Sequence, residues 1–180
     1  LVGSEMCIRD RLEEVRHVEN IKLVDGNVFS WEMCQPSLLL AQVLRDNVQL
    51  RRAYVKALQE KPCTLQEPWN ILLIFDEFTP GSLAFPQLAR KTMDVAFNFL
   101  EVGEAVLSTA ASWVMPVAVR AKKMSHAVGG WSACLAVFLR ILLVGDLGLS
   151  TAGCVFCHEG QTYTIFGKLK AICSDGEGLK

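Results

Sequence analysis

The chain has 180 residues, a formal net charge of −1, 51% hydrophobic residues and 21% charged residues. This composition is typical of a globular chain with a real core, and it excludes a long disordered or strongly basic polypeptide. The near-neutral charge gives no bulk electrostatic argument for nucleic-acid binding, although local basic runs remain. With no signal peptide, the seven cysteines are expected as reduced thiols of a nuclear or cytoplasmic protein, not as disulfides of a secreted one.

The first eleven residues read LVGSEMCIRDR and resemble a sequencing-library adapter translated in frame. Such a segment is set aside before the fold is considered. We expect residues 1–11 to be an artefact that is disordered and packs against nothing. Residues 12–180 are then expected to be a fragment of a longer chain.

Residues 12–67 are expected to form an N-terminal helical region. Its first part, residues 12–30, contains the turn signal Asp25-Gly26-Asn27 and predicts a hairpin or a loop. Residues 37–61 lack glycine and proline and carry apolar residues at helical spacing, which predicts one amphipathic helix. Its other face is basic, and we expect it to be solvated in preference to contacting phosphate. The basic residues are Arg45, Arg51, Arg52 and Lys56.

The most strand-like run of the chain covers residues 69–75, which form a continuous apolar stretch. Its length suits a central strand buried on both faces, with Asp76 at the carboxyl end. Glu77 follows, but adjacent strand residues point to opposite faces, so only one of the two acids can face a shared site. The topology favours Asp76. Residues 93–99 alternate between apolar and small or polar types, which predicts a second, half-buried strand.

Residues 113–120 predict a third strand, and Pro116 confines it to a sheet edge because proline cannot donate a ladder hydrogen bond. Residues 131–144 predict a helix with one broad apolar face that packs on the sheet. A membrane span over residues 131–149 is the weaker alternative, because Arg140 and Asp146 interrupt a run that is too short for a bilayer.

Residues 145–160 are expected to be irregular, with a short strand at 154–157. A last strand is expected to begin at residue 162 and to run on towards 172, bringing Asp175 near its end. The expected order from residue 68 is therefore strand, strand, edge strand, helix, strand. This predicts an α/β fold, more narrowly an α+β mixed sheet, in which residues 68–180 form an incomplete ribonuclease H-like domain.

In this topology a helical crossover returns the last strand beside and parallel to the first. Asp76 and Asp175 would then meet at the same end of neighbouring strands. Two carboxylates so placed can share divalent cations, which activate a water or hydroxyl and stabilise the leaving oxygen when a phosphodiester is cut. Oxygen ligands favour Mg²⁺ or Mn²⁺. The alternative, that both aspartates merely terminate strands, stays open.

Short motifs along the chain resemble a repetitive, transposase-like protein family that is abundant in dinoflagellate transcriptomes. They lie between residues 36 and 180 and comprise Pro68-Trp69, Asp76-Glu77, Thr79-Pro80-Gly81, Arg90-Lys91, Phe99-Leu100-Glu101 with Gly103, Gly129-Gly130 with Ser132, and Ile165-Phe166 leading to Asp175 and Leu179-Lys180. The chain is also similar to the central part of transposases of the En/Spm class. The resemblance implies a nuclear, carboxylate-dependent DNA-cutting domain in which Asp76 and Asp175 are catalytic residues and metal ligands.

Two departures separate the chain from this family. The third acid of such a site would lie beyond Lys180, and the family's usual ending Asp-Glu-Ala-Ala-Leu-Lys reads Asp-Gly-Glu-Gly-Leu-Lys at residues 175–180. Each glycine disfavours a helix by about 1 kcal/mol relative to alanine. These glycines indicate a decayed or drifting copy and leave its activity open. The alternative function is a non-catalytic α/β interaction or scaffold protein.

Other motifs are interpreted as structural. Cys154-Val155-Phe156-Cys157-His158 has the spacing of a haem attachment site or half a zinc site, but it has no second ligand pair. Cys134 and Cys173 are expected to be small core residues. Glu101 and Glu104 are expected to be solvated turn residues. The basic segment 120–126, which ends at His126, is expected to be a solvated loop in preference to a phosphate contact.

Overall fold

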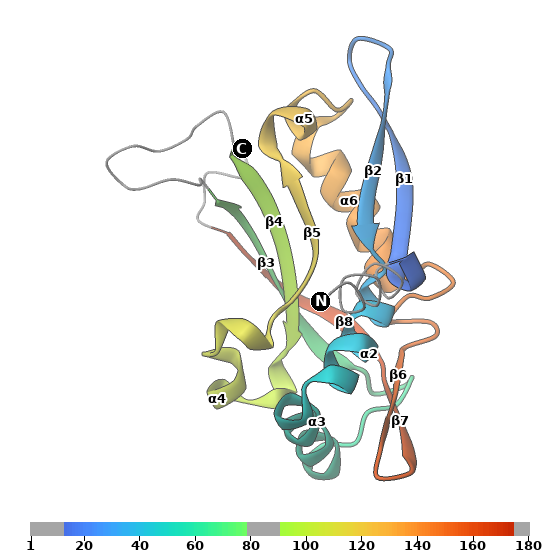
Figure 1. Cartoon of the computed structure of the whole chain (residues 1–180), viewed down its shortest axis with the longest axis vertical. Helices are drawn as coiled ribbons and strands as arrows, with labels where there is room; N and C mark the ends of the chain where they lie inside the picture. Colours follow the sequence, from blue (N-terminus) through green and yellow to red (C-terminus); the bar gives the residue numbers. More distant parts are fainter. Residues whose placement is uncertain (1–12, 79–90, 175–180) are drawn as a thin grey trace, which may run out of the picture.

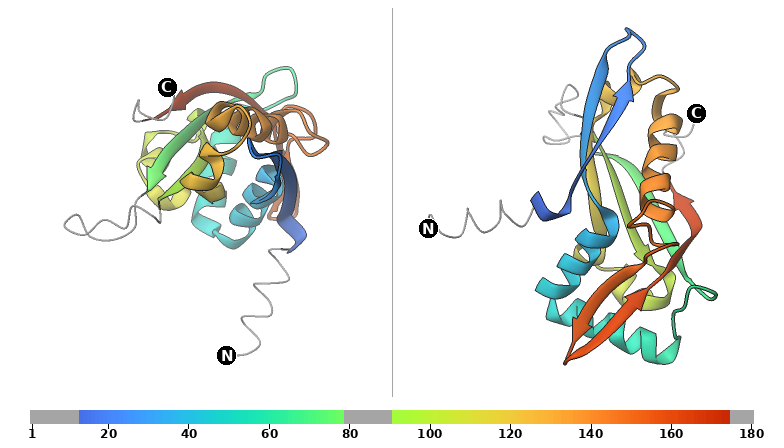
Figure 2. Two further views of the ribbon diagram at one scale, coloured as in Figure 1. Left: turned by 90° about the horizontal axis from the view of Figure 1, so that it is seen from above. Right: turned by 90° about the vertical axis from the view of Figure 1, so that its right-hand side faces the viewer.

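A computed structural model gives the structure of the chain and describes residues 13–78 and 91–174. The mixed α/β fold is confirmed, with one four-stranded sheet, two two-stranded sheets and several helices (Figures 1 and 2). The adapter-like residues 1–11 lie outside the described residues. The elements are β1 Arg16–Lys22, β2 Val28–Cys34, α2 Pro36–Asp46, α3 Val48–Glu60, β3 Trp69–Phe78, β4 Thr92–Phe99, η2 Leu100–Val102, α4 Glu104–Leu107, η3 Ala110–Ser112, β5 Val114–Arg120, α5 Ala121–Ser125, α6 Gly130–Leu143, β6 Cys154–His158, β7 Gln161–Ile165 and β8 Gly167–Cys173.

The four-stranded sheet has the order β5-β4-β3-β8. Strands β3, β4 and β5 are antiparallel neighbours, whereas β8 pairs parallel to β3, with Ile74 opposite Cys173 at the end of the described pairing. The chain passes through α6 between β5 and β8. The prediction that the last strand returns beside and parallel to the first is therefore confirmed, and β5 lies at the sheet edge as expected.

One face of the sheet carries the main core. The odd-numbered residues of β3 from Trp69 to Phe75 are buried there, and α6 packs on them through Trp131, whose ring centroid lies 5.5 Å from that of Phe75. At the other end of the strand, Tyr54 of α3 packs against Trp69, with ring centroids 6.2 Å apart. Leu72 and Ile74, on the opposite face, are only half-buried. The expectation that β3 is buried on both faces is therefore wrong for the face that carries Leu72 and Ile74. The aromatic contacts with α3 and α6 are made by the opposite face, which carries the odd-numbered residues.

The N-terminal segment forms the hairpin β1–β2, one of the two structures that the turn signal allowed. Gly26 has a φ of 85°, a conformation that favours glycine, and it lies at the tip of this turn. Figures 1 and 2 show that the hairpin turn and α5 lie at one end of the molecule, whereas α3 lies at the other.

The single helix expected over residues 37–61 is in fact two helices, α2 and α3, which meet at Asn47. The Asn47 side chain accepts a hydrogen bond from the backbone N–H of Leu50 at 3.0 Å and so caps the start of α3. Arg51 donates to the carbonyl oxygens of Leu44 and Arg45 at the end of α2. One backbone N–H at the start of α3 and two carbonyl oxygens at the end of α2 thus gain partners at the break. Arg51 is therefore a structural residue, not part of a uniformly solvated basic face.

The last predicted strand, which was expected to run from residue 162 towards 172, is divided between two sheets. β7 pairs with β6 in a separate hairpin, and β8 pairs with β3. The change of partner falls at Phe166, just before Gly167. A Cβ atom at Gly167 would lie 2.5 Å from the Ile71 Cδ1 atom, so the absence of a side chain lets β8 approach the central strand.

The remaining predictions for the sheet are confirmed in part. Met115 and Pro116 of β5 lie opposite the single residue Ala96, at a register shift that accommodates the missing proline N–H. The half-buried pattern expected for β4 holds only for its first residues, because the last five are all buried. Asn98 belongs to this buried part, where its Oδ1 atom accepts a 2.7 Å hydrogen bond from the Tyr54 hydroxyl.

The predicted helix over residues 131–144 is α6, displaced by one residue. Its buried residues, among them Phe138 and Leu142, lie on one face, which joins the core as expected. Of the helices in residues 13–78 and 91–174, none combines the length and the apolar character that a bilayer crossing requires.

Candidate functional site

Asp76 lies on the central strand β3, but it does not end that strand as expected. Pairing with β4 continues for two further residues, to Phe78 opposite Thr92. Asp76 is exposed and shares its face of the sheet with Leu72 and Ile74. The extension arises because the antiparallel partner strand supplies backbone partners beyond the apolar run.

The second predicted site residue, Asp175, lies outside the described residues. The described pairing of β3 with β8 ends at Ile74 and Cys173, which precede Asp76 and Asp175 by two residues each. The neighbouring, parallel arrangement of β3 and β8 is the part of the prediction that the structure bears out.

A carboxylate that the sequence analysis missed lies directly opposite Asp76. This residue is Asp94 of β4, which pairs with Asp76 in the antiparallel register. Directly opposed residues have Cβ atoms about 4.5–5.5 Å apart, so the two carboxylates share one face at close range. The only signal in the sequence is that Asp94 falls on the polar side of the alternating run 93–99, which does not reveal its partner.

The environment of Asp94 disfavours its charge. Burial, followed by the nearby carboxylate of Asp76, raises the pKa of Asp94 above the ordinary aspartate range. Its Oδ1 atom is buried and has no hydrogen-bond partner among the described residues. A buried acceptor in this state, beside a like charge, would be stabilised by a proton or a cation.

Thr92 and Arg120 continue this face towards the end of the sheet. Arg120 is the last residue of β5 and pairs with Thr92, whereas Ala118, two residues earlier, pairs with Asp94. Ala118 and Arg120 are both exposed. This acid pair, Asp76 and Asp94, therefore lies on an accessible surface at the same end of the sheet as the start of the basic helix α5.

Within residues 13–78 and 91–174, no group of three or more histidine, cysteine, aspartate or glutamate side chains is placed to hold a metal ion. The described residues thus offer two carboxylates at this end of the sheet. A two-metal site needs further ligands beyond this pair.

Glu101 is not the solvated turn residue that was expected. Its side chain is 3% exposed and accepts hydrogen bonds from the Asn70 backbone N–H at 2.9 Å, from Asn70 Nδ2 at 2.7 Å and from Lys61 Nζ at 2.8 Å. Burial raises the pKa of Glu101, but the hydrogen bonds from Lys61 and Asn70 outweigh this effect and lower it. Glu101 anchors the start of β3 to η2, whereas Glu104 is exposed as expected.

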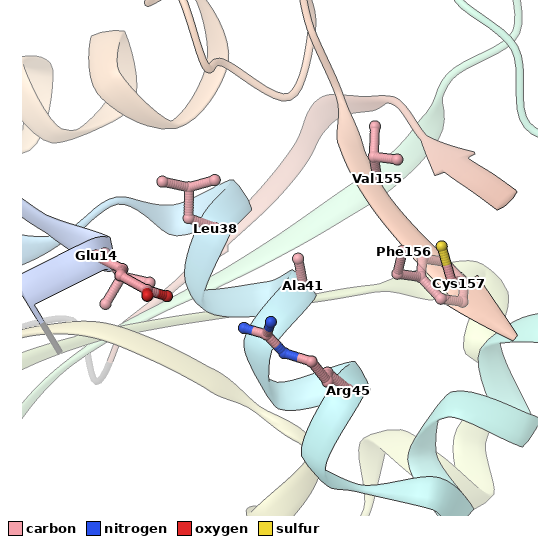
Figure 3. A pocket seen from close by; sticks show the side chains of 8 residues that line it. Glu14, Leu38, Ala41, Arg45, Val155, Phe156 and Cys157 are labelled. Atoms are coloured by element: carbon pink, nitrogen blue, oxygen red, sulfur yellow. The ribbon is translucent and has the colours of Figure 1, made fainter. Parts of the chain in front are cut away.

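The cysteines of the 154–158 motif do not share a site. Cys154 is buried and Cys157 is exposed, because residues three apart on a strand face opposite sides. Burial raises the pKa of Cys154 to about 12. Cys157 lines a hollow of about 350 Å³ against α2, where its sulfur and the Arg45 guanidinium lie on different sides (Figure 3).

Two further expectations for cysteine and basic residues are decided by the structure. Cys134 is buried in the core as expected, but Cys173 is exposed, because β8 is the outer strand of the sheet at that edge. The basic segment 120–126 is largely the short helix α5 and not a loop.

The chain was compared with protein-family models, curated protein sequences and solved structures. No protein-family model, no curated protein sequence and no solved structure matches the chain.

Proposed function

We propose that the chain is a fragment of a transposase-derived, metal-dependent nuclease or strand-transfer domain that acts on DNA in the nucleus. The observation that carries this proposal is the pair of carboxylates on neighbouring strands, Asp76 and Asp94, at an accessible end of a mixed sheet. The strand order and the parallel return of β8 are those expected for a ribonuclease H-like domain. The motif resemblance to transposases supports the same class of reaction.

The described residues fit a divalent cation. Asp94 carries a buried oxygen without a partner, and Asp76 supplies a second carboxylate on the same face. Hard oxygen ligands suit Mg²⁺ or Mn²⁺, and the cation would offset the repulsion between the two acids. We propose Asp76 and Asp175 as the original ligands and add Asp94 to them.

When bound, Mg²⁺ or Mn²⁺ supplies Lewis acidity for activating a water and for stabilising the departing oxygen of a phosphodiester. The residues of the chain contribute position and charge. Asp76 lies on the central strand, which pairs with β8 as far as Ile74, and its own backbone position is held by the pairing with Asp94 of β4. Asp94 is held in register by β3 and β5.

The proposal is tested by measuring Mn²⁺ binding and plasmid nicking on the same preparations. The variants are Asp76→Asn and Asp94→Asn, and the matched control is Asp146→Asn, which removes the same charge from an exposed loop outside the sheet. Electron paramagnetic resonance of free Mn²⁺ reports binding independently of cleavage. We expect both site variants to lose Mn²⁺ affinity by at least tenfold and to lose nicking, with the control unchanged.

Equal Mn²⁺ binding by all four proteins would refute Asp76 and Asp94 as ligands. Mn²⁺ binding that depends on both aspartates, without any nicking, would mark a decayed copy that has kept its metal site. Absence of both activities in the parent would leave the rival function, a non-catalytic α/β interaction or scaffold protein.

A further inference from the structure

A hollow of about 660 Å³ lies between the hairpin turn β1–β2 and helix α5. Neither residue of the acid pair lines it. Both elements lie at the same end of the molecule (Figures 1 and 2). The residues that line it are Leu23, Asp25, Val28, Phe29, Arg120, Lys122, Lys123 and His126. We call this feature the hairpin hollow.

The walls of the hairpin hollow are fixed to each other by backbone hydrogen bonds. The Val24 N–H donates to the His126 carbonyl oxygen at 3.0 Å, and the Val128 N–H donates to the Lys22 carbonyl oxygen at 2.8 Å. Leu23 also forms an isolated β-bridge with Ala127. The turn and the α5 segment therefore present one surface, whose shape does not depend on a ligand.

Positive charge predominates in the hairpin hollow. Arg120, Lys122 and Lys123 line it against a single carboxylate, that of Asp25. Both oxygens of Asp25 already accept hydrogen bonds from Asn27, at 2.9 Å each, and these bonds lower the pKa of Asp25. A bound polyanion would thus meet the ammonium groups of Lys122 and Lys123, and a carboxylate that already accepts hydrogen bonds within its own turn.

The same surface has an apolar part. The Lys123 ammonium lies 4.8 Å from the centroid of the Phe29 ring. Val28, which also lines the hollow, is 59% exposed, and Val24 and Val128, whose backbone hydrogen bonds join its walls, are 70% and 54% exposed. Cations beside an aromatic ring and exposed apolar side chains suit a ligand that combines phosphates with flat bases, as single-stranded nucleic acid does. A duplex would present its phosphates but keep its bases stacked inside.

The hairpin hollow begins close to the acid pair. Arg120 pairs with Thr92, and Ala118, two residues earlier on β5, pairs with Asp94. Two residues of an antiparallel strand span about 6.8 Å. A strand of nucleic acid that occupies the hollow can therefore continue past Arg120 to the face that carries Asp76 and Asp94.

We propose that the hairpin hollow binds the backbone and bases of single-stranded nucleic acid and directs the strand towards the acid pair. The binding itself does not require a metal, whereas the direction towards Asp76 and Asp94 rests on the proposed function. Lys122 and Lys123 contact phosphates, and Phe29 with Val28 contacts a base.

The test is fluorescence anisotropy of a labelled oligothymidine of about 15 nucleotides, within the usual range of single-strand site sizes, in EDTA and at several NaCl concentrations. The site variant is the double substitution Lys122→Gln and Lys123→Gln. The matched control is Lys168→Gln with Lys170→Gln, which removes two exposed cations from β8. A third variant, Phe29→Leu, keeps the apolar contact of residue 29 but removes its ring.

We expect the site variant to lose affinity and to lower the slope of log Kd against log salt by about 1.4, since each phosphate contact on single strands contributes about 0.7. The control should retain both affinity and slope. Phe29→Leu should weaken binding at every salt concentration without a change of slope, because a stacking contact releases no counterions.

Equal losses in the two lysine pairs would overturn the proposal, as would binding of anionic phospholipid vesicles in place of the oligonucleotide. Oligonucleotide binding at the hollow with neither nicking nor Mn²⁺ binding that depends on Asp76 and Asp94 would refute the proposed function alone. If the Lys122 and Lys123 variant nicks DNA with an unchanged KM, the proposed role of the hairpin hollow is refuted and the proposed function is not.

Discussion

The substitution Asp94→Asn is expected to stabilise the protein at neutral pH. It removes one of two carboxylates that face each other across β3 and β4, in a position where the Oδ1 atom is buried without a partner. The asparagine side chain has nearly the same shape, so the packing of β4 should be unchanged. Its amide can also donate a hydrogen bond to Asp76.

The size of the gain follows from the exposure of the two groups. Asp76 is exposed, so water screens much of the repulsion, and a directly opposed charge pair in a sheet is worth about 0.2–1 kcal/mol. A fully unsatisfied buried group costs about 1–3 kcal/mol. Replacing the charged Oδ1 atom by a neutral amide atom recovers only a fraction of this cost, because a polar atom still occupies the buried position. We expect a net gain of about 1 kcal/mol in the free energy of unfolding.

Urea denaturation followed by tryptophan fluorescence measures this gain. With a slope of about 2 kcal/mol per molar urea, a gain of 1 kcal/mol moves the midpoint up by about 0.5 M. The pH dependence gives a second check. Because the pKa of Asp94 is raised in the folded state, the folded protein binds more protons than the unfolded chain, and ionisation of Asp94 costs stability as pH rises.

The midpoint difference between Asp94→Asn and the parent should therefore be small below the ordinary aspartate pKa of about 3.9 and should grow as pH rises through the raised pKa. Saturating Mn²⁺ should stabilise the parent more than the variant. A variant that is less stable than the parent at pH 7, or a difference that is constant with pH, would show that the two aspartates do not repel each other in the folded protein.

Substitutions at three further positions test the structural assignments, each by urea denaturation. Glu101→Gln should cost about 1.5–3 kcal/mol at pH 7, because it weakens charge-assisted hydrogen bonds from Asn70. The loss should shrink as pH falls through the lowered pKa of Glu101. A pH-independent loss would contradict this role. Gly167→Ala should cost about 1–3 kcal/mol through overlap with Ile71, and a neutral result would mean that β8 does not approach β3 so closely. Asn47→Ala should cost about 1 kcal/mol through loss of the cap on α3, whereas Asn47→Gly should cost only a few tenths.

Much of the fold could be predicted from local patterns in the sequence. The apolar run at 69–75 predicted the central strand, the turn at Asp25 allowed the hairpin, and Pro116 placed β5 at an edge. These features depend on backbone chemistry and periodicity within a few residues, which the sequence states directly. The parallel return of β8 also followed, because a helical crossover permits few other arrangements.

The helix break at Asn47 could not be predicted from periodicity alone. The apolar spacing continues through residues 37–61, and the break depends on Arg51 reaching back to the carbonyl oxygens at the end of α2. The division between β7 and β8 depends in the same way on contact between Gly167 and Ile71, which are 96 residues apart in the sequence. Neither contact leaves a local signal.

For the candidate site, the sequence by itself determined that Asp76 follows a buried apolar run and therefore lies on a central strand. Only the tertiary structure decided that its partner is Asp94, since the register of β3 with β4 is set by burying the apolar side chains of both strands in one core, not by the residues around either acid. The register of β4 with β5 brings Arg120 into line with this face. Strand register determines which charged side chains face each other across a sheet, and register depends on contacts between residues that are far apart in the sequence.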